Sequence, residues 1–371
     1  MPSRNPSLFN GNALKLGLFG TNCSGGTAFT MLPDRWDASW DHNVELAQLA
    51  DELGIECMVP IARWKGYGGE TNVNGTSWET ITWATGLLAA TRTITVFGTV
   101  HAPMIHPVVA AKQMITADHV SHGRFGLNIV CGWNQDEFEM FGVEQREHDR
   151  RYEYGQEWCD VVKMLWSGQG PRDYEGKFFK LKGLEASPRP YGDQNPLMMN
   201  AGASPPGRAF AIRNCDLHFD GCEMPEDCVD RIKETKALAL SHAHEIQVWT
   251  AASMVCRPTQ REVDDFLHRV VAVADWEALD HLLKLFVTNL NMRSISPEHI
   301  GHFRQYEKER AILGYGGSYP IFGTPDQVVR ELNRIRMAGF DGLAIGFHNP
   351  LDELPYFAQE ILPRMKRLGL R

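Results

Sequence analysis

Residues 122–152 contain the densest group of side chains able to do chemistry. An apolar run at 124–130 includes Asn128 and leads into Cys131-Gly132-Trp133, after which acidic residues and then Arg151-Tyr152 follow. An amide, an aromatic ring and cations close together suit a flat polar ring that carries a phosphate tail. This stretch therefore predicts one side of a cofactor site.

Several catalytic and cofactor-binding motifs are missing from the sequence, and this narrows the classes of enzyme to consider. No Ser-His-Asp order, carboxylate pair or metal-ligand cluster emerges from it, so hydrolysis by protein groups alone is weakly supported. The glycines at 66–69 do not form GxGxxG and there is no P-loop, which argues against nicotinamide binding in a Rossmann mode. The pattern is typical of a site in which the protein positions a cofactor and the cofactor reacts.

Short apolar runs alternate with helical patterns along the whole chain. Most runs are continuously hydrophobic, as expected of parallel strands that are buried on both faces. Eight strands that alternate with helices predict an α/β fold, a (β/α)8 TIM barrel. The predicted strands are 14–19, 55–60, 93–99, 124–130, 196–201, 216–219, 245–255 and 343–347.

The helical patterns have recognisable starts. Asp41 is a candidate cap for the first helix, Ser77 opens the second, and Thr324-Pro325 starts the last in the usual manner. In a barrel, the residues just after the strands line the active face. The predicted helices are 41–53, 78–90, 107–120, 151–166, 206–213, 226–242, 259–273 and one from 324 onward.

Two insertions interrupt the alternation in what we expect to be a single domain over residues 1–371. Residues 167–196 follow the fourth strand, and 174–181 are predicted to form a small hairpin. Residues 276–322 lie between the seventh and eighth strands and contain a helical stretch and a mobile-looking loop at 314–317. Insertions of this size often form lids over barrel sites.

Composition excludes several classes of function. The 371 residues carry a net charge of −9 without a long basic run, so neither nucleic acid nor a membrane surface is an expected partner. The eight cysteines form no CxxC, which predicts reduced thiols and no metal site. The polar start of the chain shows no signal peptide and no segment reaches transmembrane length, so we expect a cytoplasmic protein.

Several segments together resemble the bacterial luciferase-like flavin monooxygenases. The likeness covers roughly residues 14–260 and 320–365, and it is nearest to the branch that holds the pyrimidine-ring oxygenase of uracil breakdown and the dimethylsulfone monooxygenases. The combination of RFG-N-xxxGW with a downstream RRY is the specific part. The resembling segments are ARWKGYGGET (62–71), SWETITWATGLLAATRTITVFGT (77–99), HPVVAAKQMITADHVSHGRFGLNIVCGW (106–133), HDRRYEYGQEW (148–158), NAGASPPGRAFAIRNCD (200–216) and FGTPDQV (322–328).

The resemblance implies an FMN site. Arg151 and Ser204 would hold the phosphate, Asn128 would bond the polar edge of the ring, and Trp133 would wall the cavity. Thr99 and Asn128 match the pair that holds dioxygen near the flavin N5, and are the expected catalytic residues. The implied cofactor-binding residues are Ala62, Arg63, Asn128, Trp133, Glu137, Arg151, Tyr152 and Ser204.

The implied activity is that of a two-component monooxygenase. Reduced FMN from a separate NAD(P)H:flavin reductase and dioxygen would give a flavin peroxide that oxygenates a small organic substrate. A deazaflavin-dependent oxidoreductase and a non-catalytic flavin-binding protein are the alternatives. A sulfone, an N-heterocyclic amide and a halogenated aromatic all remain possible substrates, since Cys131 departs from the hydroxyl of those relatives. The apolar helices at 77–91 and 106–120 suggest a homo-oligomer.

Overall fold

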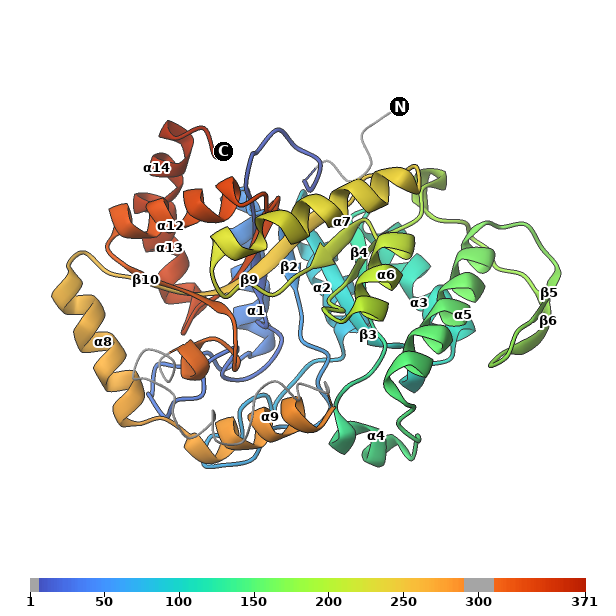
Figure 1. Cartoon of the computed structure of the whole chain (residues 1–371), viewed down its shortest axis with the longest axis horizontal. Coiled ribbons are helices and arrows are strands. Elements are labelled where there is room, and N and C mark those ends of the chain that lie inside the picture. The colour runs from blue at the N-terminus through green and yellow to red at the C-terminus, as the bar shows by residue number, and fades with distance from the viewer. Residues whose placement is uncertain (1–6, 290–309) are drawn as a thin grey trace.

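Eight parallel strands close a barrel at the centre of the molecule (Figure 1). The computed structural model describes residues 7–289 and 310–371. The barrel closes because the first strand pairs with both the second and the last. Each strand overlaps one predicted run, so the (β/α)8 prediction is confirmed. The strands are β1 (Lys15–Phe19), β2 (Cys57–Val59), β3 (Thr95–His101), β4 (Phe125–Val130), β7 (Leu197–Asn200), β8 (Leu217–Phe219), β9 (Gln247–Cys256) and β11 (Gly342–Gly346).

A ninth parallel strand, β10 (Tyr319–Gly323), was not predicted. It pairs with residues 252–256 of β9, beyond residues 247–249 where β9 pairs with β8. The interpretation of residues 276–322 as a helix and a loop was therefore wrong for residues 319–322, which form a strand. Pro320 argues against a strand in the sequence, but proline is tolerated on an edge strand. Among the described strands β10 pairs with β9 alone, so no neighbouring strand on its other edge requires a backbone N–H donor from Pro320.

Helices surround the barrel, and the first two have other caps than the sequence predicted. Ser39, not Asp41, caps the first, and Glu79 rather than Ser77 caps the second. The Ser77 hydroxyl instead donates to the carbonyl oxygen of Arg63 at 2.8 Å. Thr324 caps its helix as predicted. The helices are α1 (Trp40–Glu52), α2 (Thr80–Ala90), α3 (Pro107–Val120), α4 (Gln135–Phe141), α5 (His148–Trp166), α6 (Pro205–Asn214), α7 (Val229–Ser241), α8 (Gln260–Ala272), α9 (Trp276–Asn289), α12 (Pro325–Met337), α13 (Pro350–Glu360) and α14 (Leu362–Arg367).

A plug of apolar side chains fills the barrel, and a cavity lies beyond it at the carboxyl ends of the strands. Trp249 lies in this plug with Phe97, Met199 and Leu217, all of them buried. Gly342 on β11 makes room for it, since a Cβ atom there would lie 2.2 Å from the indole. The plug therefore forms a floor on which a site can be built.

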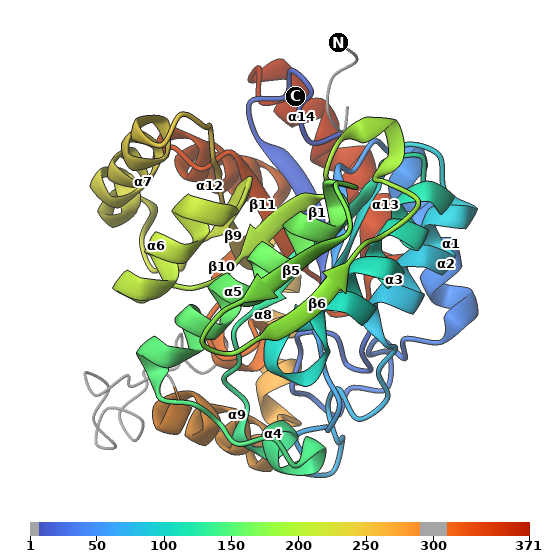
Figure 2. The same ribbon diagram turned by 90° about the vertical axis from the view of Figure 1, so that its right-hand side faces the viewer.

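The first insertion forms the predicted hairpin, with β5 (Arg172–Glu175) antiparallel to β6 (Lys180–Leu184). The hairpin lies outside the barrel beside α5 (Figure 2). Glu157 on α5 anchors it, because its carboxylate accepts the backbone N–H groups of Lys177 and Phe178 at 2.8 and 2.9 Å.

The second insertion contributes α9, which lies with α4 at the end of the molecule opposite the two termini in both ribbon views. His281 of α9 and Asp136 of α4 are 3.0 Å apart, which joins the two helices over the carboxyl ends of the strands. Within the described part of the chain, no helix combines the length and the apolar character needed to cross a bilayer.

Candidate active site

Two adjoining cavities lie above the floor of the barrel. The central cavity, of about 170 Å³, is lined by residues of six strands (β1, β2, β3, β4, β8 and β9) and by loops that follow strands. The side cavity, of about 340 Å³, lies between the ends of β4 and β7 and the start of α5. Both cavities are lined by Val130, Trp133, Ala201 and Tyr315, so together they form one elongated site.

Thr99 and Asn128 form a hydrogen-bonded pair on the wall of the central cavity. They are register partners on β3 and β4. The Thr99 hydroxyl donates to the carbonyl oxygen of Pro60 at 2.6 Å, and the Asn128 amide nitrogen donates to the Thr99 oxygen at 3.2 Å. Because the single proton of Thr99 is used by Pro60, the hydroxyl can only accept from Asn128. This fixes the amide orientation and leaves Asn128 Oδ1 buried without a hydrogen-bond partner.

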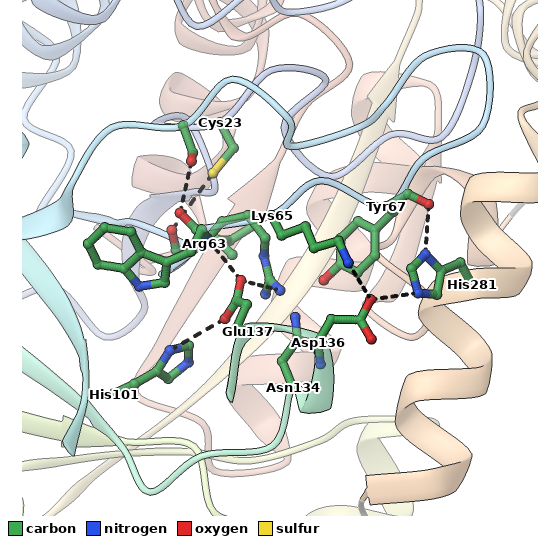
Figure 3. A network of polar contacts seen from close by, with 12 residues as sticks. Cys23, Arg63, Lys65, Tyr67, His101, Asn134, Asp136, Glu137 and His281 are labelled. Atoms are coloured by element: carbon green, nitrogen blue, oxygen red, sulfur yellow. Dashed lines mark hydrogen bonds and ion pairs between the residues drawn. The ribbon is translucent and has the colours of Figure 1, made fainter. Parts of the chain in front are cut away.

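A buried ion pair supports the neighbouring part of the wall, after β2 (Figure 3). Arg63 Nη1 lies 3.0 Å from Glu137 Oε1, and their side chains are only 1% and 0% exposed. Glu137 also accepts the backbone N–H of Trp64 at 2.9 Å and lies 3.6 Å from the His101 ring. Glu137 borders neither the central nor the side cavity, so its contacts position Arg63, which does line the central one.

Aromatic side chains hold the other faces of the Arg63 guanidinium. Its carbon lies 5.0 Å from the ring centre of Tyr67 and 5.3 Å from that of Trp133. Arg63 Nη2 also donates to the Tyr315 hydroxyl at 3.1 Å, and the Tyr67 and Tyr315 hydroxyls are hydrogen-bonded to each other. Cation–π contacts and hydrogen bonds thus keep this cation in one orientation beside the cavity.

Burial controls the charges of this network. It lowers the pKa of His101 to about 3, helped by repulsion from Arg63, so the imidazole is neutral near pH 7. Burial also raises the pKa of Glu137, while the neighbouring Arg63 opposes that change. The network therefore presents one compensated ion pair and a neutral ring to the cavity.

The side cavity has the groups of an anion site. Arg151, in the first turn of α5, donates from Nε to the carbonyl oxygen of Arg146 at 2.7 Å and from Nη1 to that of Gly132 at 3.0 Å. The Tyr152 hydroxyl is hydrogen-bonded to the side chain of Ser204, which caps α6. A Cβ at Gly202 would lie 2.9 Å from that hydroxyl, so glycine permits the close approach. A helix N-terminus beside an arginine favours a phosphate or carboxylate.

The structure brings most of the predicted residues together. Ala62, Arg63, Thr99, Asn128 and Trp133 line the central cavity. Trp133, Arg151 and Tyr152 line the side cavity, while Ser204 lies behind Tyr152 as a helix cap.

The sequence reasoning missed Tyr315, which borders both cavities although its glycine-rich loop at 314–317 was interpreted as mobile. The available signal in the sequence was a large aromatic residue placed between glycines, which could have marked Tyr315 as a residue of the site. Cys131 also lines the side cavity, and burial raises the pKa of its thiol. All eight cysteines are free. In the described ranges no three His, Cys, Asp or Glu side chains gather as metal ligands would.

Comparison with known proteins identifies the family. The model of the luciferase-like monooxygenases matches residues 15–342. The chain belongs to the luciferase-like monooxygenase family. It is 28% identical to an FMNH(2)-dependent dimethylsulfone monooxygenase of Pseudomonas fluorescens, over 96% of this chain and 95% of that one. It is 25% identical to the pyrimidine monooxygenase RutA of Serratia proteamaculans, over 95% of this chain and 96% of that one.

Among solved structures, the luciferase-like chain is similar to a riboflavin lyase crystallised with modified FMN and riboflavin. The TM-score is 0.83 with 21% identity, over 96% of this chain and 92% of that one. At this identity the likeness shows the shared barrel fold. The predicted family resemblance is thereby confirmed, including the branch to which the two curated relatives belong.

Proposed function

We propose that this family member is a two-component monooxygenase that binds reduced FMN across the two cavities and oxygenates a small organic molecule. The observation that carries the proposal is the buried, unpartnered Oδ1 of Asn128 on the wall of a cavity that adjoins a cationic one. A buried acceptor without a partner costs free energy unless a ligand donates to it. An N–H group on a flat ring would satisfy it.

The residues present fit FMN from end to end. The central cavity would take the ring, with Asn128 at its polar edge and Trp133 and Tyr315 where the two cavities meet. The side cavity would take the phosphate, held by Arg151 and Tyr152, with Ser204, the cap of α6, behind Tyr152.

Reduced FMN, when bound, supplies the electrons that activate dioxygen. The protein's own part is to orient and to exclude water. Thr99 holds the Asn128 amide so that an acceptor, not a donor, is available to the ring, which suits the N–H of the reduced form. Arg63, fixed by Glu137, supplies a compensated cation beside the reacting face, and Trp133 and Tyr67 shield it from solvent.

Three further parts of the proposal rest on the relatives and the sequence. The name of the dimethylsulfone enzyme specifies the reduced cofactor, which supports supply by a separate reductase. A family match over residues 15–342 supports a single domain. The apolar helices α2 and α3 support a homo-oligomer.

The test is oxygen-coupled turnover with a flavin reductase, NADH and a panel of small substrates. Thr99→Ala and Asn128→Ala should each lower product formation by about 10²-fold, the typical effect of removing one polar group at the reacting centre. Thr99→Ser keeps the hydroxyl and should recover most of the activity. Wild-type protein that binds FMN in neither redox state, or that is protected thermally by a deazaflavin instead, would overturn the proposal.

A further inference from the structure

A third cavity lies on the far side of the Arg63 network. It has a volume of about 180 Å³ and lies between the end of β3, the start of α2 and the end of α4. We call it the aromatic chamber, because Trp64, Trp78 and Phe141 line it together with Ile81, Met104 and Ile105. Trp64 and Phe141 pack edge to face with ring centres 5.1 Å apart.

The aromatic chamber shares a wall with the central cavity. Ala62, Arg63, Thr99 and His101 line both spaces. Thr99 is the residue that orients the Asn128 amide, so a molecule in the aromatic chamber lies beside the groups expected to contact the flavin ring. This position suits the molecule that reacts, not a remote ligand.

The charged side chains around the aromatic chamber are already compensated. Arg63 is paired with Glu137 at 3.0 Å. Glu79 uses both carboxylate oxygens on the first turn of α2, accepting the N–H groups of Ile81 and Thr82 at 3.0 and 2.8 Å. His101 is buried beside a cation and is neutral near pH 7. A charged ligand would therefore lose hydration and find no uncompensated partner.

Size and lining define the class of ligand. A cavity of about 150 Å³ lined by apolar side chains holds one benzene molecule. The aromatic chamber is slightly larger, and its three aromatic residues are unusually open, with Trp64 43%, Trp78 37% and Phe141 37% exposed. Exposed aromatic side chains gathered around one hollow mark a binding surface. Gln113, at the same cavity, offers an amide to a polar substituent.

We propose that the aromatic chamber binds the substrate and selects an uncharged compound with a single aromatic ring. This proposal rests on the proposed function and makes it specific, because it favours a neutral aromatic molecule over an acyclic sulfone or a polyanion.

The test compares benzamide with benzoate, two probes of nearly equal shape that differ in charge. Binding is measured on the whole protein by quenching of tryptophan fluorescence, without turnover. Benzamide should bind with a Kd below about 1 mM and benzoate at least about tenfold more weakly. Met104→Trp adds bulk inside the aromatic chamber and should weaken benzamide at least tenfold. Met337→Trp makes the same change on exposed α12 and should leave the Kd unchanged.

Equal binding of the two probes, failure of both to bind, or unchanged benzamide affinity in Met104→Trp would overturn the proposal. FMN is titrated in parallel, which separates the two claims. If FMN binds and benzamide does not, the aromatic chamber proposal fails while the proposed function stands. If benzamide behaves as expected but FMN does not bind, the proposed function fails and only the preference of the chamber remains. Retained FMN binding also shows that Met104→Trp is folded.

Discussion

Replacing Glu137 by glutamine should destabilise the protein by leaving Arg63 as a buried charge without its counter-ion. Removing one partner of a buried pair costs about 3–5 kcal/mol. We expect about 3 kcal/mol, the lower end of that range, since glutamine keeps an acceptor for the Trp64 N–H and Arg63 keeps its contact with Tyr315. The unfolding entropy is about 2.1 cal/mol/K per residue, summed over 371 residues. Dividing the free-energy cost by this entropy gives a decrease in Tm of about 4 °C.

The assay is thermal unfolding followed by circular dichroism, with a double-mutant cycle. Arg63→Met combined with Glu137→Gln should be at least about 1 kcal/mol less destabilised than the sum of the two single changes, because no buried charge is left. Glu153→Gln is the control: its ion pair with Lys177 is about half exposed and should contribute less than about 1 kcal/mol. Strict additivity in the cycle, or a Glu137→Gln shift no larger than the control's, would refute the reasoning.

Two further predictions concern buried groups outside the cavities. Burial raises the pKa of Asp118 from 3.8 to about 6; its stabilising contribution is complete below pH 3.8 and is lost as the pH rises through about 6. Asp118→Asn, which still accepts the Tyr191 N–H, should therefore raise Tm at pH 8 and leave it nearly unchanged at pH 4; a gain at both would contradict this. Gly342→Ala places a methyl group against Trp249 and should cost about 1–3 kcal/mol in urea unfolding, whereas Gly317→Ala, with open space around its Cβ position, should cost less.

The strands could be predicted from local sequence, whereas the Thr99–Asn128 pair was expected from the family resemblance. Continuous apolar runs mark strands buried on both faces, and residues at the carboxyl ends of consecutive parallel strands become neighbours. The register of β3 and β4 then places Thr99 opposite Asn128. Periodicity was enough for the strands, and the geometry of the barrel explains why the two residues that the resemblance singled out are neighbours.

The contacts of Tyr315 and the pairing of β10 could not be predicted in the same way. Arg63 and Tyr315 are 252 residues apart, and their contact depends on how the second insertion folds back over the barrel. Likewise β10 exists because β9 is long enough to pair with β8 at one end and with β10 at the other. The helix starts at Ser39 and Glu79 were missed because several polar residues compete for each cap.

The polar contacts of Asp136 and His281 are more exposed to solvent than the Arg63–Glu137 ion pair. Asp136 reaches Lys65 at 3.6 Å and His281 at 3.0 Å, and His281 reaches the carbonyl oxygen of Tyr67 at 2.9 Å (Figure 3). These groups are partly exposed, so each contact is weak and easily exchanged for water. The Arg63–Glu137 pair beneath them is fully enclosed. The outer contacts can therefore rearrange without displacing Arg63, because none of them involves the Arg63–Glu137 ion pair.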